Sequence, residues 1–227
     1  MLRSIYMLRI LLLSCSFSVI AQAGEWVSLF DGESLKGWTN GGGKAVEEGG
    51  WVAENGILYR KGKGGSLFSE KEFADFEFRF EWKISEKGNS GVKYRVVKYD
   101  GGALLGPEYQ VLDDDKHPDG KVGLNRQSAA LYDILPADAE KKKLNMVGEW
   151  NTSRIVARGG HFQHFLNGEK VIDITVGSDQ WKELIAQSKF KKSKGFAENA
   201  KGRLMLQDHS DPVWYRKLEI RELASKK

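Results

Sequence analysis

The chain has 227 residues, a length that suits one large domain or two small ones. Hydrophobic residues make up 41% and charged residues 29%, which excludes a disordered chain, and the 7 Trp and 11 Phe residues can fill a substantial core. The formal net charge of +4 drops to +2 without Arg3 and Arg9 of the leader described next. The lysines at 141–143 and 189–194 lack the interleaved aromatics that stack on bases, so no nucleic-acid partner is expected.

Residues 1–23 have the features of a secretory signal peptide. A basic start, MLRSIYMLR, precedes the apolar run ILLLSCSFSVI, and Ala21-Gln22-Ala23 fits a small-x-small cleavage site. The alternative is a lipoprotein anchored through Cys15. The apolar run is short for a membrane span, and no later segment approaches about 18 apolar residues, so no transmembrane anchor is expected. Cleavage leaves one domain, 24–227, without cysteine and therefore without disulfides.

The first strand signals lie between residues 76 and 112. FEFRFEWKI (76–84) alternates apolar and charged residues without a slip, which predicts a half-buried strand. After the turn Glu86-Lys87-Gly88-Asn89, SGVKYRVVKY from residue 90 predicts the next strand. EYQVL (108–112) follows beyond a glycine-rich link.

The second half of the chain predicts a meander and one helix. Gly159-Gly160 and Asn167-Gly168 are suited to tight hairpins that join three strands. Residues 178–190 predict the helix, with Ser178 or Asp179 as its cap, and residues 203–223 predict two more strands around a short turn. We therefore expect an all-β protein, a two-sheet antiparallel jelly-roll sandwich with one short helix.

The acidic segment after residue 108 does not closely match an EF-hand calcium loop or the acid pair of a retaining glycosidase. Counted from Asp113 as an EF-hand loop, its sixth position is Pro118 and its twelfth is Leu124, so that motif fails. A looser calcium site built from Asp113, Asp115 and Asp119 stays open, as does a solvated loop.

A retaining glycosidase needs two carboxyl groups about 5 to 5.5 Å apart. Asp113 points away from Glu108 on a regular strand, and one β-bulge would bring the two together. Gln110 stands where laminarinase-type strands have a middle acid, which favours a sugar-binding face over ordinary glycosidase chemistry.

His209 ends the first of the two C-terminal strands beside Asp208. A histidine in this position can transfer protons, because its pKa lies near working pH. The alternative is a structural histidine whose hydrogen bonds are satisfied within a turn. This alternative applies equally to His117, His161 and His164. Aromatic residues such as Trp214 can stack on sugar rings, although most of them are expected in the core.

Seven segments, in order and at compatible spacing, resemble the 3-keto-disaccharide hydrolase family across nearly all of the chain after the leader. These are WVSLFDGESLKGW (26–38), KGNSGVKYRV (87–96), GPEYQVLDDDKHPDG (106–120), LYD (131–133), GEWNTSRIV (148–156), HFLNGEKV (164–171) and GRLMLQDHSDPVWYRKLEIREL (202–223). The resemblance implies a concanavalin A-like sandwich exported to the bacterial periplasm. It also implies cleavage of sugars whose 3-hydroxyl is oxidised to a ketone, by hydrolysis or elimination, and coupling to a sugar 3-dehydrogenase. The alternative is a non-catalytic glycan-binding module on the same fold.

The resemblance also implies site residues. His209 and Glu108 are expected to form the acid–base pair, with Arg95 neutralising an enolate. The remaining expected substrate ligands are Gln110, Asn89, Gln207 and Trp214. The second choices, for acid–base work or for a cation, are Asp113, His117 and Asp133. No cofactor is required by the sequence, and a divalent cation is compatible with it. The Ser-Asp-Pro that follows His209 departs from the glycine of many relatives.

Overall fold

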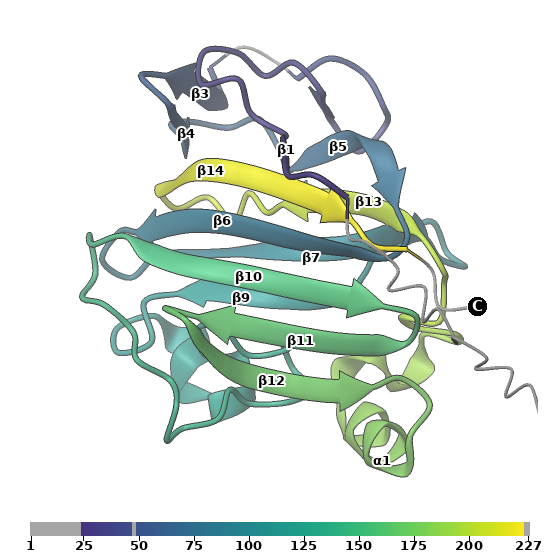
Figure 1. Ribbon diagram of the computed structural model, residues 1–227. Helices are drawn as coiled ribbons and strands as arrows, with labels where there is room; N and C mark the ends of the chain where they lie inside the picture. The colour runs from purple at the N-terminus through teal and green to yellow at the C-terminus, as the bar shows by residue number, and fades with distance from the viewer. Residues whose placement is uncertain (1–23, 47–48, 225–227) are drawn as a thin grey trace, which may run out of the picture.

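In the computed structural model, which describes residues 24–46 and 49–224, two antiparallel sheets pack face to face (Figure 1). This confirms the expected two-sheet antiparallel sandwich. The predicted signal peptide and Cys15 lie outside the described residues, so export stays a prediction. No helix within the described ranges is long and apolar enough to cross a membrane.

The larger sheet has eight strands and is built around the strand predicted at 76–84. Its strands, in spatial order, are β12 (Glu169–Thr175), β11 (His161–Leu166), β10 (Asn151–Arg158), β6 (Phe76–Ile84), β14 (Val213–Glu222), β4 (Ile57–Arg60) and β3 (Trp51–Glu54), with β1 (Val27–Ser28) pairing with β14. The β10–β11–β12 meander has the two predicted hairpin turns. Gly159, Asn167 and Gly168 all adopt positive φ there, as such tight turns require.

The smaller sheet has six strands and contains the two segments expected to carry the site. Its strands are β2 (Trp38–Thr39), β5 (Leu67–Phe73), β13 (Gly202–Leu206), β7 (Asn89–Lys98) and β8 (Leu104–Leu105), with β9 (Glu108–Leu112) also pairing with β7. β7 and β9 run antiparallel without a slip, with Lys93 opposite Glu108 and Asn89 opposite Leu112.

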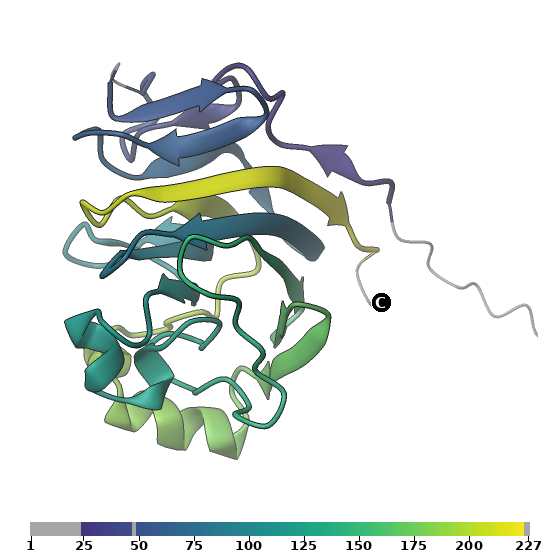
Figure 2. The ribbon, with the colours of Figure 1, turned by 90° about the vertical axis from the view of Figure 1, so that its left-hand side faces the viewer.

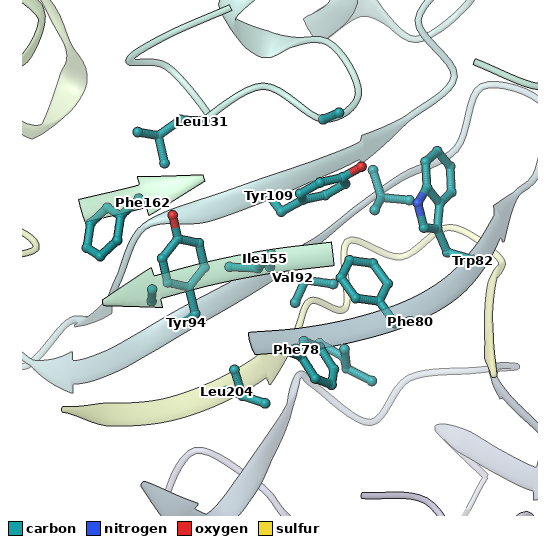
Figure 3. Close-up of a cluster of buried hydrophobic side chains, with 14 of the residues drawn as sticks. Phe78, Phe80, Trp82, Val92, Tyr94, Tyr109, Leu131, Ile155, Phe162 and Leu204 are labelled. Atoms are coloured by element: carbon teal, nitrogen blue, oxygen red, sulfur yellow. The ribbon is translucent and has the colours of Figure 1, made fainter. Parts of the chain in front are cut away.

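The core lies between the sheets and follows from period-2 alternation. The apolar residues of β6 point inward, including Phe78, Phe80 and Trp82, and they meet the inward side chains of β7 and β9 (Figure 3). Phe80 packs edge-on against Tyr109, with ring centroids 5.5 Å apart. Because β7 and β9 bury Tyr94 and Tyr109 here, their alternate residues must face away from the core.

The helical segments gather at the end of the sandwich away from β3 and β4 (Figure 2). The helix α1 (Asp179–Gln187) starts as predicted at Ser178, whose hydroxyl accepts a hydrogen bond from the Trp181 amide. It ends earlier than expected, and the 3₁₀ turn η3 (Lys189–Lys192) follows it. Two further 3₁₀ turns, η1 (Pro118–Lys121) and η2 (Leu124–Arg126), follow β9.

The two strands predicted at the end of the chain, β13 and β14, both form, but they lie in different sheets. β13 belongs to the six-stranded sheet and β14 to the eight-stranded sheet, so the connection between them crosses from one layer to the other. Arg60 of β4 holds this connection by binding the carboxylate of Asp208 and donating to the carbonyl of Ser210. This crossing places His209 at the rim of the sandwich.

Candidate active site

The outward face of β7 and β9 gathers polar residues from two strands that are neighbours in space. Val92, Tyr94, Tyr109 and Val111 point into the core. The alternate residues point the other way, and the register sets them side by side. These outward residues are Asn89, Gly91, Lys93, Glu108 and Gln110.

Glu108 lies at the centre of this face. Its side chain is only 3% exposed, and its Oε2 lies 3.5 Å from Nζ of Lys93. A Cβ atom built on Gly91 would lie 2.2 Å from Oε1 of Glu108. The carboxylate therefore occupies the space that a side chain at position 91 would need, and Gly91 is the residue that admits it.

Two amide oxygens beside Glu108 have no hydrogen-bond partner among the residues that the structure describes. Gln110 donates through Nε2 to the carbonyl of Arg126, at 3.3 Å, while its Oε1 has none. Oδ1 of Asn89 is also unpartnered, and both residues are almost fully buried. Unsatisfied buried acceptors are rare in proteins. Acceptors of this kind suit the hydroxyl groups of a sugar.

A charged network borders the face on the segment that follows β9. The amide of Tyr132 donates to the carbonyl of Glu108, at 3.0 Å, which joins this segment to the strand. Arg126 donates to Asp119 and to Asp133, each at 2.8 Å, and the Tyr132 hydroxyl donates to Asp119. Burial, followed by that hydrogen bond, raises the pKa of Tyr132, so the hydroxyl keeps its proton. Burial alone would raise the pKa of Asp119, but the bonds from Arg126 and Tyr132 outweigh it and lower the pKa.

Lys189 of η3 adds a second ammonium near Glu108. Its Nζ lies 4.1 Å from the ring centroid of Tyr132 and 5.1 Å from that of Phe190. The residue as a whole is exposed, and its ammonium lies against the two rings. Desolvation lowers the pKa of Lys189, and the nearby charge of Glu108 acts in the opposite direction.

At the end of the face near Asn89, two loops bring His117 and His209 together. Their ring centroids are 5.9 Å apart, and Nδ1 of His209 lies 3.8 Å from Oδ2 of Asp211. The same Asp211 oxygen accepts a hydrogen bond from the Asn89 amide, at 3.0 Å. Gln207 lies nearby, because its amide donates to the carbonyl of Gly91. Six of the expected residues thus lie on or beside one face: Glu108, Gln110, Asn89, Gln207, His117 and His209.

Arg95 is not part of this face, and its expected role is corrected. It adopts a positive φ of 47° in a bulge, where three steps along β7 match two along β13. The bulge turns the side chain inward, where it donates to the carbonyls of Ala74 and Gly159 and to Asp75. Val96 takes the outward position instead.

Trp214, expected as a substrate ligand, also lies away from this face. It lies on β14 opposite Lys83, whose ammonium lies over its ring, 4.8 Å from the centroid. Lys83 alternates with the buried residues of β6, so this pair covers the outer face of the eight-stranded sheet. The face that carries Glu108 belongs to the other sheet.

The acidic second choices serve the loops that frame the site. Asp113 is almost fully buried and accepts from the amides of Lys87, Asp115 and Lys116. No bulge turns it toward Glu108, so the two are not a glycosidase acid pair. Asp133 accepts from Arg126 and from the amide of Lys189, at 2.7 Å. Both carboxylates therefore bind backbone amides, and Asp133 also binds Arg126, rather than facing an open position.

Sequence reasoning missed three residues that the fold brings to the site. Lys93 had a usable signal, because it alternates in phase with Asn89 and Gly91 along one strand. Lys189 and Asp211 had none. They reach the site through a 3₁₀ turn and through the connection that crosses between the sheets.

Residues 25–221 match the family described as the 3-keto-alpha-glucoside-1,2-lyase-like domain. The chain belongs to this family. A curated relative from Bacteroides thetaiotaomicron, named a 3-keto-disaccharide hydrolase, is 35% identical over 92% of this chain and 82% of its own length.

Solved structures with the same fold agree with this family assignment. A Parabacteroides distasonis protein, provisionally named a glycosyl hydrolase, is 30% identical over 88% of this chain and 94% of its own, with a TM-score of 0.79. A second one from the same organism is 26% identical over 88% of this chain and 100% of its own, with a TM-score of 0.69. A Bacillus subtilis protein with a galectin-like fold shares the fold alone, at 10% identity, 90% and 97% coverage and a TM-score of 0.55.

Proposed function

We propose that this protein cleaves the glycosidic bond of 3-keto-glycosides, including 3-keto-disaccharides, by removing the proton on C2 and expelling the group on C1. The family and the name of the curated relative support the substrate class. The observation that carries the reaction type is a single buried carboxylate, Glu108, beside Lys93 on the outward face. The next acid along the chain, Asp113, directly follows β9 and accepts hydrogen bonds from three backbone amides.

The chemistry needs one base and a stabilised oxygen rather than two acids. A ketone at C3 acidifies the C2–H bond, and a base takes that proton while the electron pair forms an enolate. The enolate reforms the ketone, makes a C1–C2 double bond and breaks the bond between C1 and the leaving oxygen, which takes up a proton. Water added across the double bond completes a net hydrolysis; without that addition the reaction is an elimination.

Each role has a side chain on the face. Glu108 is the base for the C2 proton, and Lys93, assisted by Lys189, stabilises the developing charge on the enolate oxygen. These lysines take the role that the sequence gave to Arg95. His209 is the acid–base partner for the leaving oxygen at the other end of the face. The acceptor oxygens of Gln110 and Asn89, with Gln207, bind sugar hydroxyls.

Glu108 and His209 are associated with two positions of β7 that lie two residues apart. Residues two apart on a strand are about 7 Å apart, so Asn89 and Gly91 are separated by roughly the width of a pyranose. Glu108 lies over Gly91, and Asp211 with His209 is attached at Asn89. A ring placed between them contacts the base on one side and the histidine on the other.

The substrate must come from an enzyme that oxidises the 3-hydroxyl of a sugar, so we propose functional coupling to a sugar 3-dehydrogenase. Export to the periplasm, with the signal peptide or a Cys15 anchor, belongs to the same proposal and rests on residues 1–23 of the sequence.

The direct test uses a 3-keto-glucoside with a chromogenic aglycone, with the unoxidised glucoside as control. We expect release from the keto compound alone. In heavy water, the hydrated product should carry deuterium at C2, whereas a product left at the elimination stage should have lost its C2 hydrogen altogether. Release from both compounds would indicate an ordinary glycosidase. Glycan binding without release from either would indicate a binding module, and both results would overturn the proposal.

The variant Glu108→Gln keeps the size of the side chain and removes the base. We expect release to fall about 10²- to 10⁴-fold. Glu219→Gln is the matched control, since Glu219 pairs with Arg79 on the other sheet. Equal rates in the two variants would overturn the role of Glu108.

A further inference from the structure

His117, His209 and Asp211 form a cluster on two loops that are distant in sequence. His117 precedes η1, after β9, while His209 and Asp211 lie in the connection between β13 and β14. One ligand atom from each lies within 4.8 Å of the others. Across residues 24–46 and 49–224, no other group of three His, Cys, Asp or Glu side chains meets this spacing.

We propose that these three residues bind a divalent transition-metal ion. Two imidazole nitrogens and one carboxylate oxygen on one side of an ion leave further positions open for water or for a substrate oxygen. Zinc, manganese, cobalt and ferrous iron accept such ligands. Calcium and magnesium prefer oxygen ligands alone, so this donor set selects against them.

Contacts outside the cluster fix the ligand-bearing loops. Asp211 accepts from the Asn89 amide through Oδ2. Asp208, next to His209, binds Arg60 and accepts from the amide of Gly65, at 3.0 Å. Such surrounding bonds orient ligands before the ion arrives, which favours affinity.

The loop that carries His117 is fixed by hydrogen bonds in the same way. Asp113 accepts from three backbone amides where β9 ends, and the His117 amide donates to the carbonyl of Asp113, at 3.0 Å. His117 therefore lies on a turn that these hydrogen bonds stabilise.

His117 gives the proposal a distinctive consequence. Its Nδ1 accepts a hydrogen bond from the amide of Asp119, at 3.1 Å, so the neutral ring carries its proton on Nε2. An ion bound at Nε2 requires the proton to move to Nδ1, and an ion at Nδ1 takes the lone pair directly. In both cases the Asp119 amide loses its acceptor. Metal binding must therefore change the environment of that one amide.

The ion would lie at the Asn89 end of the face, opposite Glu108. There, His209 would hold the ion, and a water on the ion would supply the proton for the leaving oxygen, because coordination lowers the pKa of water. This last step rests on the proposed function. The ion site itself does not.

The test begins with full-length protein freed of metal by a chelator and dialysed. Zn²⁺, Mn²⁺ and Co²⁺ are titrated separately by calorimetry, and Co²⁺ also by its visible absorption. We expect one ion per chain for at least one metal. His209→Ala and Asp211→Asn should each weaken its affinity at least 10-fold. His161→Ala, which removes a histidine paired with Asp173 elsewhere, should not. Absence of binding, or equal affinity in all variants, overturns the site.

A second readout follows the Asp119 amide by ¹⁵N NMR or hydrogen exchange during the titration. We expect its signal to shift and its exchange to accelerate, whereas the Trp181 amide, capped by Ser178, should stay unchanged. An unchanged Asp119 amide in a protein that binds metal overturns this ligand set. Assaying metal-free and loaded protein with the 3-keto-glucoside separates the proposals. Binding without release overturns the reaction alone, and release without binding overturns the ion site alone.

Discussion

Glu108 and Lys93 face each other across the β7–β9 ladder, with carboxylate and ammonium 3.5 Å apart and Gly91 beneath the carboxylate. A base beside a cation suits the removal of a proton next to a ketone, because the cation stabilises the enolate that forms. The two residues come from neighbouring antiparallel strands, so the sheet itself sets their spacing.

Gly91→Ala should disable the site through the position of Glu108. The new Cβ would overlap Oε1 of Glu108, and the carboxylate must move. We expect kcat to fall at least 10-fold, since misplacement of a reacting group by about 1 Å can cost 10²-fold. Steady-state kinetics measure this. Gly160→Ala is the control, because its nearest neighbour lies 3.5 Å away. A normal rate for Gly91→Ala would contradict the position of the base.

Lys189 should set the alkaline limit of activity. Its pKa is lowered chiefly by desolvation, so the ammonium is lost at a lower pH than in an ordinary lysine. Activity that needs the ammonium is present below that pKa and declines as the pH rises through it. In pH profiles of kcat/KM, Lys189→Arg should move the decline to higher pH. Lys192→Met, on the exposed side of the same turn, should leave the profile unchanged. Identical profiles for wild type and Lys189→Arg would refute the role.

Arg95→Met and Lys93→Met should separate stability from activity. Removing Arg95 takes the charged partner from Asp75, which keeps the hydrogen bond from the Gly159 amide, and the donors from two carbonyls; this costs about 3–5 kcal/mol of unfolding free energy. Lys93→Met should lower activity with a smaller loss of stability, since the Lys93 side chain keeps 15% of its surface exposed and forms one ion pair, with Glu108. Urea denaturation and kinetics check both variants. A stable, inactive Arg95→Met protein would restore Arg95 to the site.

His164 should make the fold sensitive to acid. The ring is buried, donating from Nδ1 to the carbonyl of Ala129 and accepting from the Tyr94 hydroxyl, and burial lowers its pKa from 6.5 to about 4. The unfolded chain binds the proton first, so this contribution is complete above pH 6.5 and is lost as pH falls toward 4. The loss is on the order of 3 kcal/mol.

Denaturant titrations between pH 7 and pH 4 measure this loss, with His164→Gln as the variant that cannot titrate. His161→Gln, at a more exposed position, should keep the wild-type slope. If wild type and His164→Gln lose stability in parallel, the assignment to His164 is wrong.

The strands and their faces were predictable because period-2 alternation is local. FEFRFEWKI forms β6 with its aromatic residues inside, and EYQVL forms β9 with Glu108 and Gln110 on the opposite face from Tyr109. The hairpin turns were predictable for the same reason, since Gly and Asn tolerate positive φ. Arg95 was misplaced because a bulge, invisible in the alternation, reverses its direction.

The sequence by itself determined the sandwich, the family and the face that carries Glu108, Gln110 and Asn89, because these follow from local periodicity and from motifs along the chain. Only the tertiary structure decided which charges join that face. Lys189 arrives from η3, and Asp211 arrives with His209 on a connection between the two sheets. Trp214 lies on the other sheet for the same reason. The layer in which a strand is placed depends on packing among distant segments, and no local pattern encodes it.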